Sequence, residues 1–119
     1  MGSDLFDPFS LLHFSVGVFF YAINIDFIYT FLLHTIFEII ENSPVGVNFI
    51  NTHLSFWPGK KRLADTLKNS TSDLLFSIIG WLGAKKIRDI YKIKNIYILL
   101  LSLTTIIAFL EVRKTISLI

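Results

Sequence analysis

Cysteine is absent from the 119 residues of this chain, and proline occurs only three times. Without cysteine there is no disulfide, no thiolate nucleophile and no cysteine-ligated zinc site. Charged residues are also scarce, at 17% of the chain, whereas soluble domains contain about 25%. The net charge of +2 is too small to indicate nucleic-acid binding, and the lysines are not interleaved with aromatic residues. We therefore expect no nucleic-acid partner.

Apolar residues are abundant, at 53% of the chain, and phenylalanine alone contributes 12 residues. A soluble fold of this length cannot bury so much apolar surface in one core. The composition therefore predicts a single integral membrane domain over residues 1–119, multi-pass, with membrane lipids as its partners. Which membrane holds the chain, and whether it forms an oligomer, stays open.

The apolar residues fall into four segments, at about residues 8–25, 26–41, 63–84 and 90–110. Each has 16–22 residues, near the ~20 that cross a hydrocarbon layer of ~30 Å. The short polar tract at 24–26 predicts a tight turn, and Asn42-Ser43-Pro44 predicts a helix end. No alternation of period two indicates strands. The sequence thus predicts an all-α fold, a four-helix transmembrane bundle.

One substantial loop, residues 42–62, is expected between the second and third helices. It is too apolar for a free linker, and Trp57 and the basic triplet at 60–62 predict that it lies along the membrane interface. Basic residues do not decide the orientation, because six fall on one side of the predicted bundle and five on the other. The six are Lys60, Lys61, Arg62, Lys68, Arg113 and Lys114, and the five are Lys85, Lys86, Arg88, Lys92 and Lys94.

Polar residues gather at the margins of three of the four segments, spaced so that each set shares one helix face. In an up-down-up-down bundle these three margins meet at the same membrane face. Ionisable groups at membrane depth are costly and indicate a site. The residues are Asp7, Ser10 and His13 on the first helix, His34, Glu38 and Glu41 on the second, and Asp65, Asn69 and Asp73 on the third.

Three interpretations of this cluster stay open. His13, His34, Glu38 and Asp73 offer the mixed nitrogen and oxygen ligands that suit a divalent ion such as zinc, manganese or iron. Alternatively, Glu38 or Asp73 acts as a catalytic base with His13 or His34 as its partner. Thirdly, the cluster is a buried hydrogen-bond network that fixes helix packing. The residues expected to line the pocket are Asp7, Ser10, Glu41, Asn42, Asp65 and Asn69.

The tracts Glu38-Ile-Ile-Glu41-Asn42-Ser43-Pro44 and Asp65-Thr-Leu-Lys-Asn69-Ser70-Thr-Ser72-Asp73 resemble a family of small bacterial inner-membrane proteins. That family has no established activity, and its pattern also includes a Ser and a His on the first helix, matched here by Ser10 and His13. The likeness covers about residues 7–83, and a more distant one is to VanZ-like membrane proteins. It implies a polytopic membrane protein with a polar intramembrane site and no particular reaction. The Lys-Arg-rich insertion before Asp65 departs from the pattern.

The function that the sequence favours is a membrane protein with a polar, metal-binding pocket at one membrane face. Two alternatives remain: a hydrolase or transferase acting on a lipid headgroup, and a structural envelope protein with a buried polar network. Whether the chain is an enzyme is undecided at this stage.

Overall fold

The computed structural model of the chain describes residues 8–54 and 66–117. Within these ranges the fold is all-helical, with five helices and no strand, which confirms the all-α part of the predicted fold class. The helices are α1 (Pro8–Ala22), α2 (Phe27–Glu41), α3 (Pro44–His53), α4 (Leu67–Tyr91) and α5 (Asn95–Ser117).

A tight turn joins α1 to α2, as the polar tract at 24–26 predicted. Asn24 adopts a left-handed conformation with φ 66°, which asparagine tolerates better than most residues. Asp26 caps α2, because its side chain accepts a hydrogen bond from the backbone N–H of Tyr29 at 2.9 Å. The indole Nε1 of Trp81 on α4 donates to the carbonyl oxygen of Ile25 at 2.8 Å and holds the turn against α4.

The connection after α2 contains a helix, so the expectation of a loop over residues 42–62 is wrong for 44–53. The predicted helix end is present, since Asn42 terminates α2. However, Ser43 caps a new helix by accepting a hydrogen bond from the backbone N–H of Gly46 at 3.0 Å, and Pro44 stands in its first turn. Trp57 and the triplet at 60–62 lie outside the described residues.

The third and fourth apolar segments have different bounds from those predicted. α4 continues through the charged residues 85–89 to Tyr91, and α5 starts at Asn95. The Nζ of Lys85 donates to Asp89 Oδ2 at 2.7 Å, an i,i+4 pair that supports the helix and lowers the pKa of the Asp89 carboxyl. The helix ends at Lys92, which has φ 55°.

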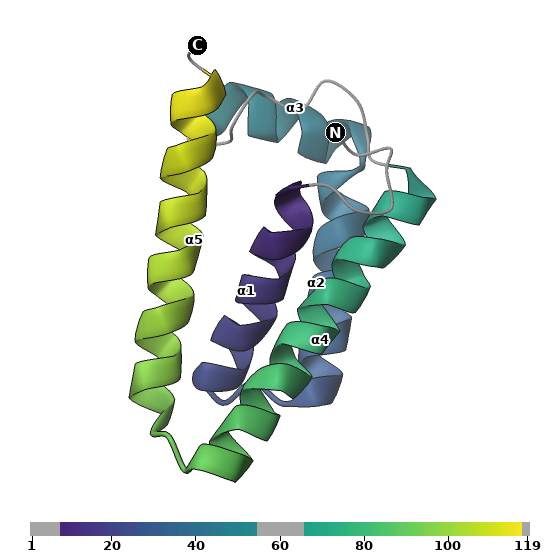
Figure 1. The fold of residues 1–119 in the computed structure, drawn as a ribbon. Coiled ribbons are helices and arrows are strands. Elements are labelled where there is room, and N and C mark those ends of the chain that lie inside the picture. Colours follow the sequence, from purple (N-terminus) through teal and green to yellow (C-terminus); the bar gives the residue numbers. More distant parts are fainter. Residues whose placement is uncertain (1–7, 55–65, 118–119) are drawn as a thin grey trace.

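The helix α1 lies between α5 on one side and α2 and α4 on the other (Figure 1). α1 and α4 run in the same direction and touch backbone to backbone. A methyl group on Gly17 would overlap the carbonyl oxygen of Ser77, and one on Gly80 would overlap the carbonyl oxygen of Phe14. Glycine at both positions therefore permits the close approach of α1 and α4. α3 lies across the end of the bundle where α1 and α4 begin.

The interior has an apolar end and a polar end. Near the α4–α5 connection, Tyr21, Ala22, Trp81, Ala84 and Ile98 form an apolar core. Polar side chains fill the end where α1 and α4 begin. In the described part of the chain twelve buried residues are polar or charged, against seven that are hydrophobic, which reverses the usual ratio.

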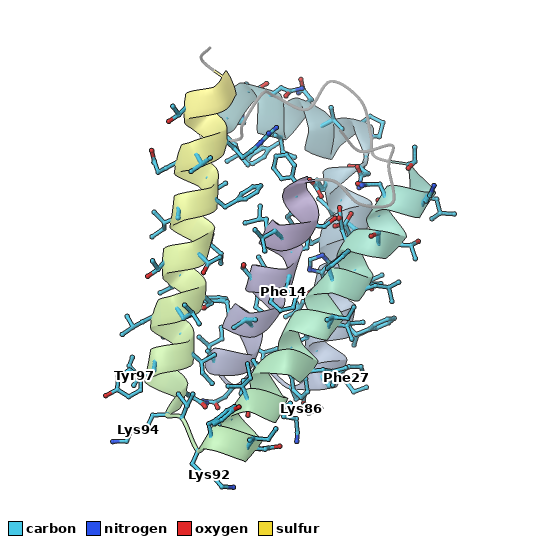
Figure 2. All side chains as sticks on the ribbon, viewed as in Figure 1. Phe14, Phe27, Lys86, Lys92, Lys94 and Tyr97 are labelled. Carbon is cyan, nitrogen blue, oxygen red and sulfur yellow. The ribbon has the colours of Figure 1, made fainter. Side chains whose placement is uncertain are left out.

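One helical segment among the described residues, Asn95–Arg113, is long and apolar enough to cross a membrane by length and composition. Phe9–Ala22 is apolar but shorter. In Figure 2 the side chains of α5 project from both flanks of the helix, and Lys86, Lys92 and Lys94 lie at the end where α4 joins α5.

Candidate functional site

Two histidines and a glutamate from two helices meet inside the polar end of the bundle. Nδ1 of His13 on α1 lies 3.0 Å from Nε2 of His34 on α2. Oε1 of Glu38, one turn further along α2, lies 3.4 Å from that His34 nitrogen and 3.8 Å from His13 Nδ1. All three side chains are buried. These three atoms form a compact triangle of potential metal ligands, which we call the His–His–Glu triangle.

Asp73 of α4 contacts His13 from the opposite edge of the imidazole. Its Oδ2 lies 3.3 Å from His13 Nε2, and the residue is 2% exposed. The predicted set of four metal ligands therefore divides into the triangle and one carboxylate beyond it. Of the three predicted catalytic residues, His13 contacts both Glu38 and Asp73.

Helix packing explains why His13 and Asp73 meet. His13 precedes Gly17 by four residues, and Asp73 precedes Ser77 by four. Gly17 and Ser77 are in backbone contact, so the pair one helical turn earlier lies between the same two helices. The close approach of α1 and α4 thus determines the distance between the imidazole and the carboxylate.

Asn42, at the end of α2, links the triangle to α4. Its Nδ2 donates to the backbone oxygen of Glu38 at 2.9 Å, to Glu38 Oε2 at 3.3 Å and to Ser70 Oγ at 3.2 Å. The other carboxylate oxygen, Glu38 Oε1, is buried and has no hydrogen-bond partner among the described residues. A buried acceptor of this kind requires an explanation, such as a water molecule or an ion.

Other predicted pocket residues also lie in the interior. Ser10, Glu41 and Asn69 are buried, and Asn42 is half-buried. Asp7 and Asp65 lie outside the described residues. Thr30 of α2, which is 0% exposed, was not among the residues predicted to line the pocket. It precedes His34 by four residues, so extending the polar face of that helix by one turn would have identified it.

The geometry of the triangle fits a tetrahedral metal ion. Zinc binds imidazole nitrogen and carboxylate oxygen at about 2.0–2.2 Å, which places neighbouring ligands of a tetrahedron about 3.3–3.6 Å apart. The three edges of the triangle, 3.0, 3.4 and 3.8 Å, lie on both sides of this value. Small shifts of the side chains would suffice to bind the ion.

The third histidine of the chain is separate from this site. His53 is exposed at the end of α3, where its ring packs beside Phe49 with 4.9 Å between ring centroids. The exposure of His53 indicates a solvated side chain rather than a buried metal ligand. His53 therefore supplies a natural control for experiments on His13 and His34.

Comparison with protein-family models, curated proteins and solved structures finds no match for this chain. The resemblance to small inner-membrane proteins remains a prediction, and function has to be inferred from the site.

Proposed function

We propose that the chain is a multi-span membrane protein that binds one divalent transition-metal ion through His13, His34 and Glu38. The metal part of the proposal depends on a single observation, the buried triangle whose ligand atoms all lie within 4.8 Å of one another. The membrane part depends on the distribution of apolar side chains over the surface.

Helix α2 supports immersion in lipid most strongly. Every buried residue of this helix is polar, namely Thr30, His34, Glu38 and Glu41. Its other faces expose large apolar side chains, among them Ile28, Leu32, Ile36, Ile39 and Ile40. In water each exposed isoleucine or leucine would forgo about 1.5–3 kcal/mol relative to burial. Lipid removes that cost, and it also makes a polar interior the favourable arrangement.

The lengths of the helices are compatible with several spans in a thinned layer. At 15 residues, α1 and α2 are each about 22 Å long, whereas α4 and α5, with 25 and 23 residues, reach about 35–38 Å. A span shorter than the hydrocarbon layer is accommodated by local thinning, at a modest cost per ångström. The proposed bundle consists of α1, α2, α4 and α5, with α3 at the interface.

A cation would relieve two unfavourable features of the site. It would bind Glu38 Oε1, which has no hydrogen bond to any described residue, and it would offset the charge of an acid buried at 6% exposure. Two imidazoles and one carboxylate suit zinc, and also iron and other first-row ions. In a zinc-loaded protein, His13 Nδ1, His34 Nε2 and Glu38 would be the protein ligands.

The test is the zinc content of the detergent-purified chain after loading and exhaustive dialysis. We expect about one zinc per wild-type chain, and much less than one for Glu38→Gln, which keeps the shape of the side chain but loses its charge. The matched control is Glu111→Gln, an exposed acid on α5, which should bind zinc like wild type.

A structural network is the competing explanation, and two contacts favour it. His13 and His34 are hydrogen-bonded to each other, and Asn42 links α2 to α4. If wild type retains no zinc, and Glu38→Gln lowers the melting temperature as much with chelator as without it, the network is the correct account and the metal proposal is wrong.

A further inference from the structure

We infer that Asp73 is a positioning residue for the metal site, not a ligand: its carboxylate holds the proton of His13 on Nε2 and so leaves Nδ1 free to bind the ion. The role in metal binding rests on the proposed function, but the tautomer of His13 does not.

The two nitrogens of His13 face different groups. Nδ1 points into the triangle, 3.0 Å from His34 Nε2 and 3.8 Å from Glu38 Oε1. Nε2 points away from the triangle toward Asp73 Oδ2, at 3.3 Å. A single ion bound to Nδ1 cannot also be reached through Nε2, because the two nitrogens lie on different edges of the ring. Asp73 is therefore placed beyond the ligand that it contacts.

A neutral imidazole carries one proton, and its neighbours determine which nitrogen holds it. A carboxylate next to Nε2 favours the proton there, since an ionised acceptor makes the stronger hydrogen bond. Nδ1 then presents its lone pair to the triangle. This tautomer also accounts for the 3.0 Å contact, with His34 Nε2 donating to His13 Nδ1.

The carboxylate–histidine–metal arrangement is common in zinc proteins, and loss of the outer carboxylate typically weakens metal binding about 10- to 100-fold. Burial should strengthen the effect here, because Asp73 is 2% exposed and few water molecules can replace it. Asp73, which the sequence predicted to be a metal ligand or a catalytic base, thus orients His13 instead.

The first test reads the tautomer directly by ¹⁵N NMR of histidine-labelled, metal-free protein in detergent. There are three histidines, and His34→Ala and His53→Ala assign the signals. We expect His13 to carry its proton on Nε2 in wild type and in Asp73→Asn, whose amide oxygen still accepts a hydrogen bond. Asp73→Ala should shift His13 toward a mixture of tautomers. A wild-type His13 with its proton on Nδ1 would overturn the inference.

The second test measures zinc affinity by competition with a chelator. Asp73→Ala should bind one zinc about 10- to 100-fold more weakly than wild type, Asp73→Asn should lose less, and the exposed-acid control Asp89→Asn should be unchanged. If Asp73→Asn retains no zinc, the carboxylate is a ligand and the inference is wrong. Equal affinity for wild type and Asp73→Ala also contradicts it. If wild type itself binds no zinc, the proposed function fails and the NMR result alone decides the role of Asp73. If Asp73→Ala does not fold, Asp73→Asn and the wild-type tautomer decide.

Discussion

His13 lies at the centre of the polar cluster because its ring contacts side chains from two other helices. Nδ1 faces His34 and Glu38 of α2, and Nε2 faces Asp73 of α4. An imidazole has two chemically distinct nitrogens, so one side chain can serve as a ligand and as a hydrogen-bond donor together. At the scale of single residues, the proposed site is one buried imidazole oriented by a carboxylate.

Replacing His34 by alanine should abolish the stabilisation of the folded chain by zinc. In wild type, zinc at about 1,000 times its dissociation constant should stabilise the folded chain by about 4 kcal/mol, and a chelator should reverse this. His34→Ala should melt at the same temperature with zinc and with chelator. The measurement is thermal unfolding in detergent, and His53→Ala, whose histidine is exposed, serves as the control that keeps the full zinc effect.

Much of the candidate site could be predicted from residue spacing. The faces His34/Glu38/Glu41 and Asn69/Asp73 are spaced by whole helical turns, and a polar face inside an apolar segment indicates the interior. Spacing could not separate the proposed ligand His13 from Asp73, which lies behind it, because the two roles depend on which edge of the His13 ring faces which helix. That information comes only from the packing of α1 on α4.

At the scale of helices, the contact between α1 and α4 supports the site. The two backbones approach at Gly17, one turn beyond His13, and at Gly80, two turns beyond Asp73. A side chain at either glycine would push the helices apart and lengthen the distance between imidazole and carboxylate. The site therefore depends on residues that carry no functional group.

Gly17→Ala and Gly80→Ala should each destabilise the chain by about 1–3 kcal/mol, because a methyl group would overlap backbone atoms of the neighbouring helix. Both should also weaken zinc binding. Gly83→Ala is the control on the same helix, since a methyl group there meets nothing within 4 Å. It should be neutral or gain up to about 1 kcal/mol from helix propensity. Equal melting temperatures for Gly80→Ala and Gly83→Ala would contradict the packing argument.

The helices themselves were partly predictable. The turn at 24–26 and the end of α2 follow from Asn, Asp and Pro, whose local preferences are strong. The bounds of α4 were missed because the charged stretch 85–89 looked like a connection, although an i,i+4 pair lets it continue as helix. The helix α3 was missed because Ser43-Pro44 was treated only as a stop, whereas serine and proline also start helices.

At the scale of the whole molecule, polar groups fill the interior and apolar groups cover the surface. The proposal of several membrane spans rests on this distribution. Among the described residues, Asn95–Arg113 alone has the length and composition of a span by itself. At 15 residues, α2 is too short to be counted as a span by length. In α4, the buried polar residues and the exposed charged residues within 85–89 together lower the hydropathy of the helix.

The absence of cysteine allows this topology to be tested with single-cysteine variants. Asn48→Cys on α3 and Lys94→Cys beside α5 are exposed at opposite ends of the bundle. In sealed membrane vesicles an impermeant maleimide should label one of them, and the other only after permeabilisation. Leu32→Cys, on the outer face of α2, should resist labelling in both cases. Rapid labelling of Leu32→Cys in sealed vesicles would show that α2 faces water.

The central claim, a metal ion held by His13, His34 and Glu38, is tested most directly by X-ray absorption at the zinc edge of the loaded, detergent-purified chain. The account predicts a first shell of nitrogen and oxygen at about 2.0–2.2 Å, with outer-shell scattering from two imidazoles. A spectrum of zinc surrounded by oxygen alone, without imidazole scattering, would contradict it.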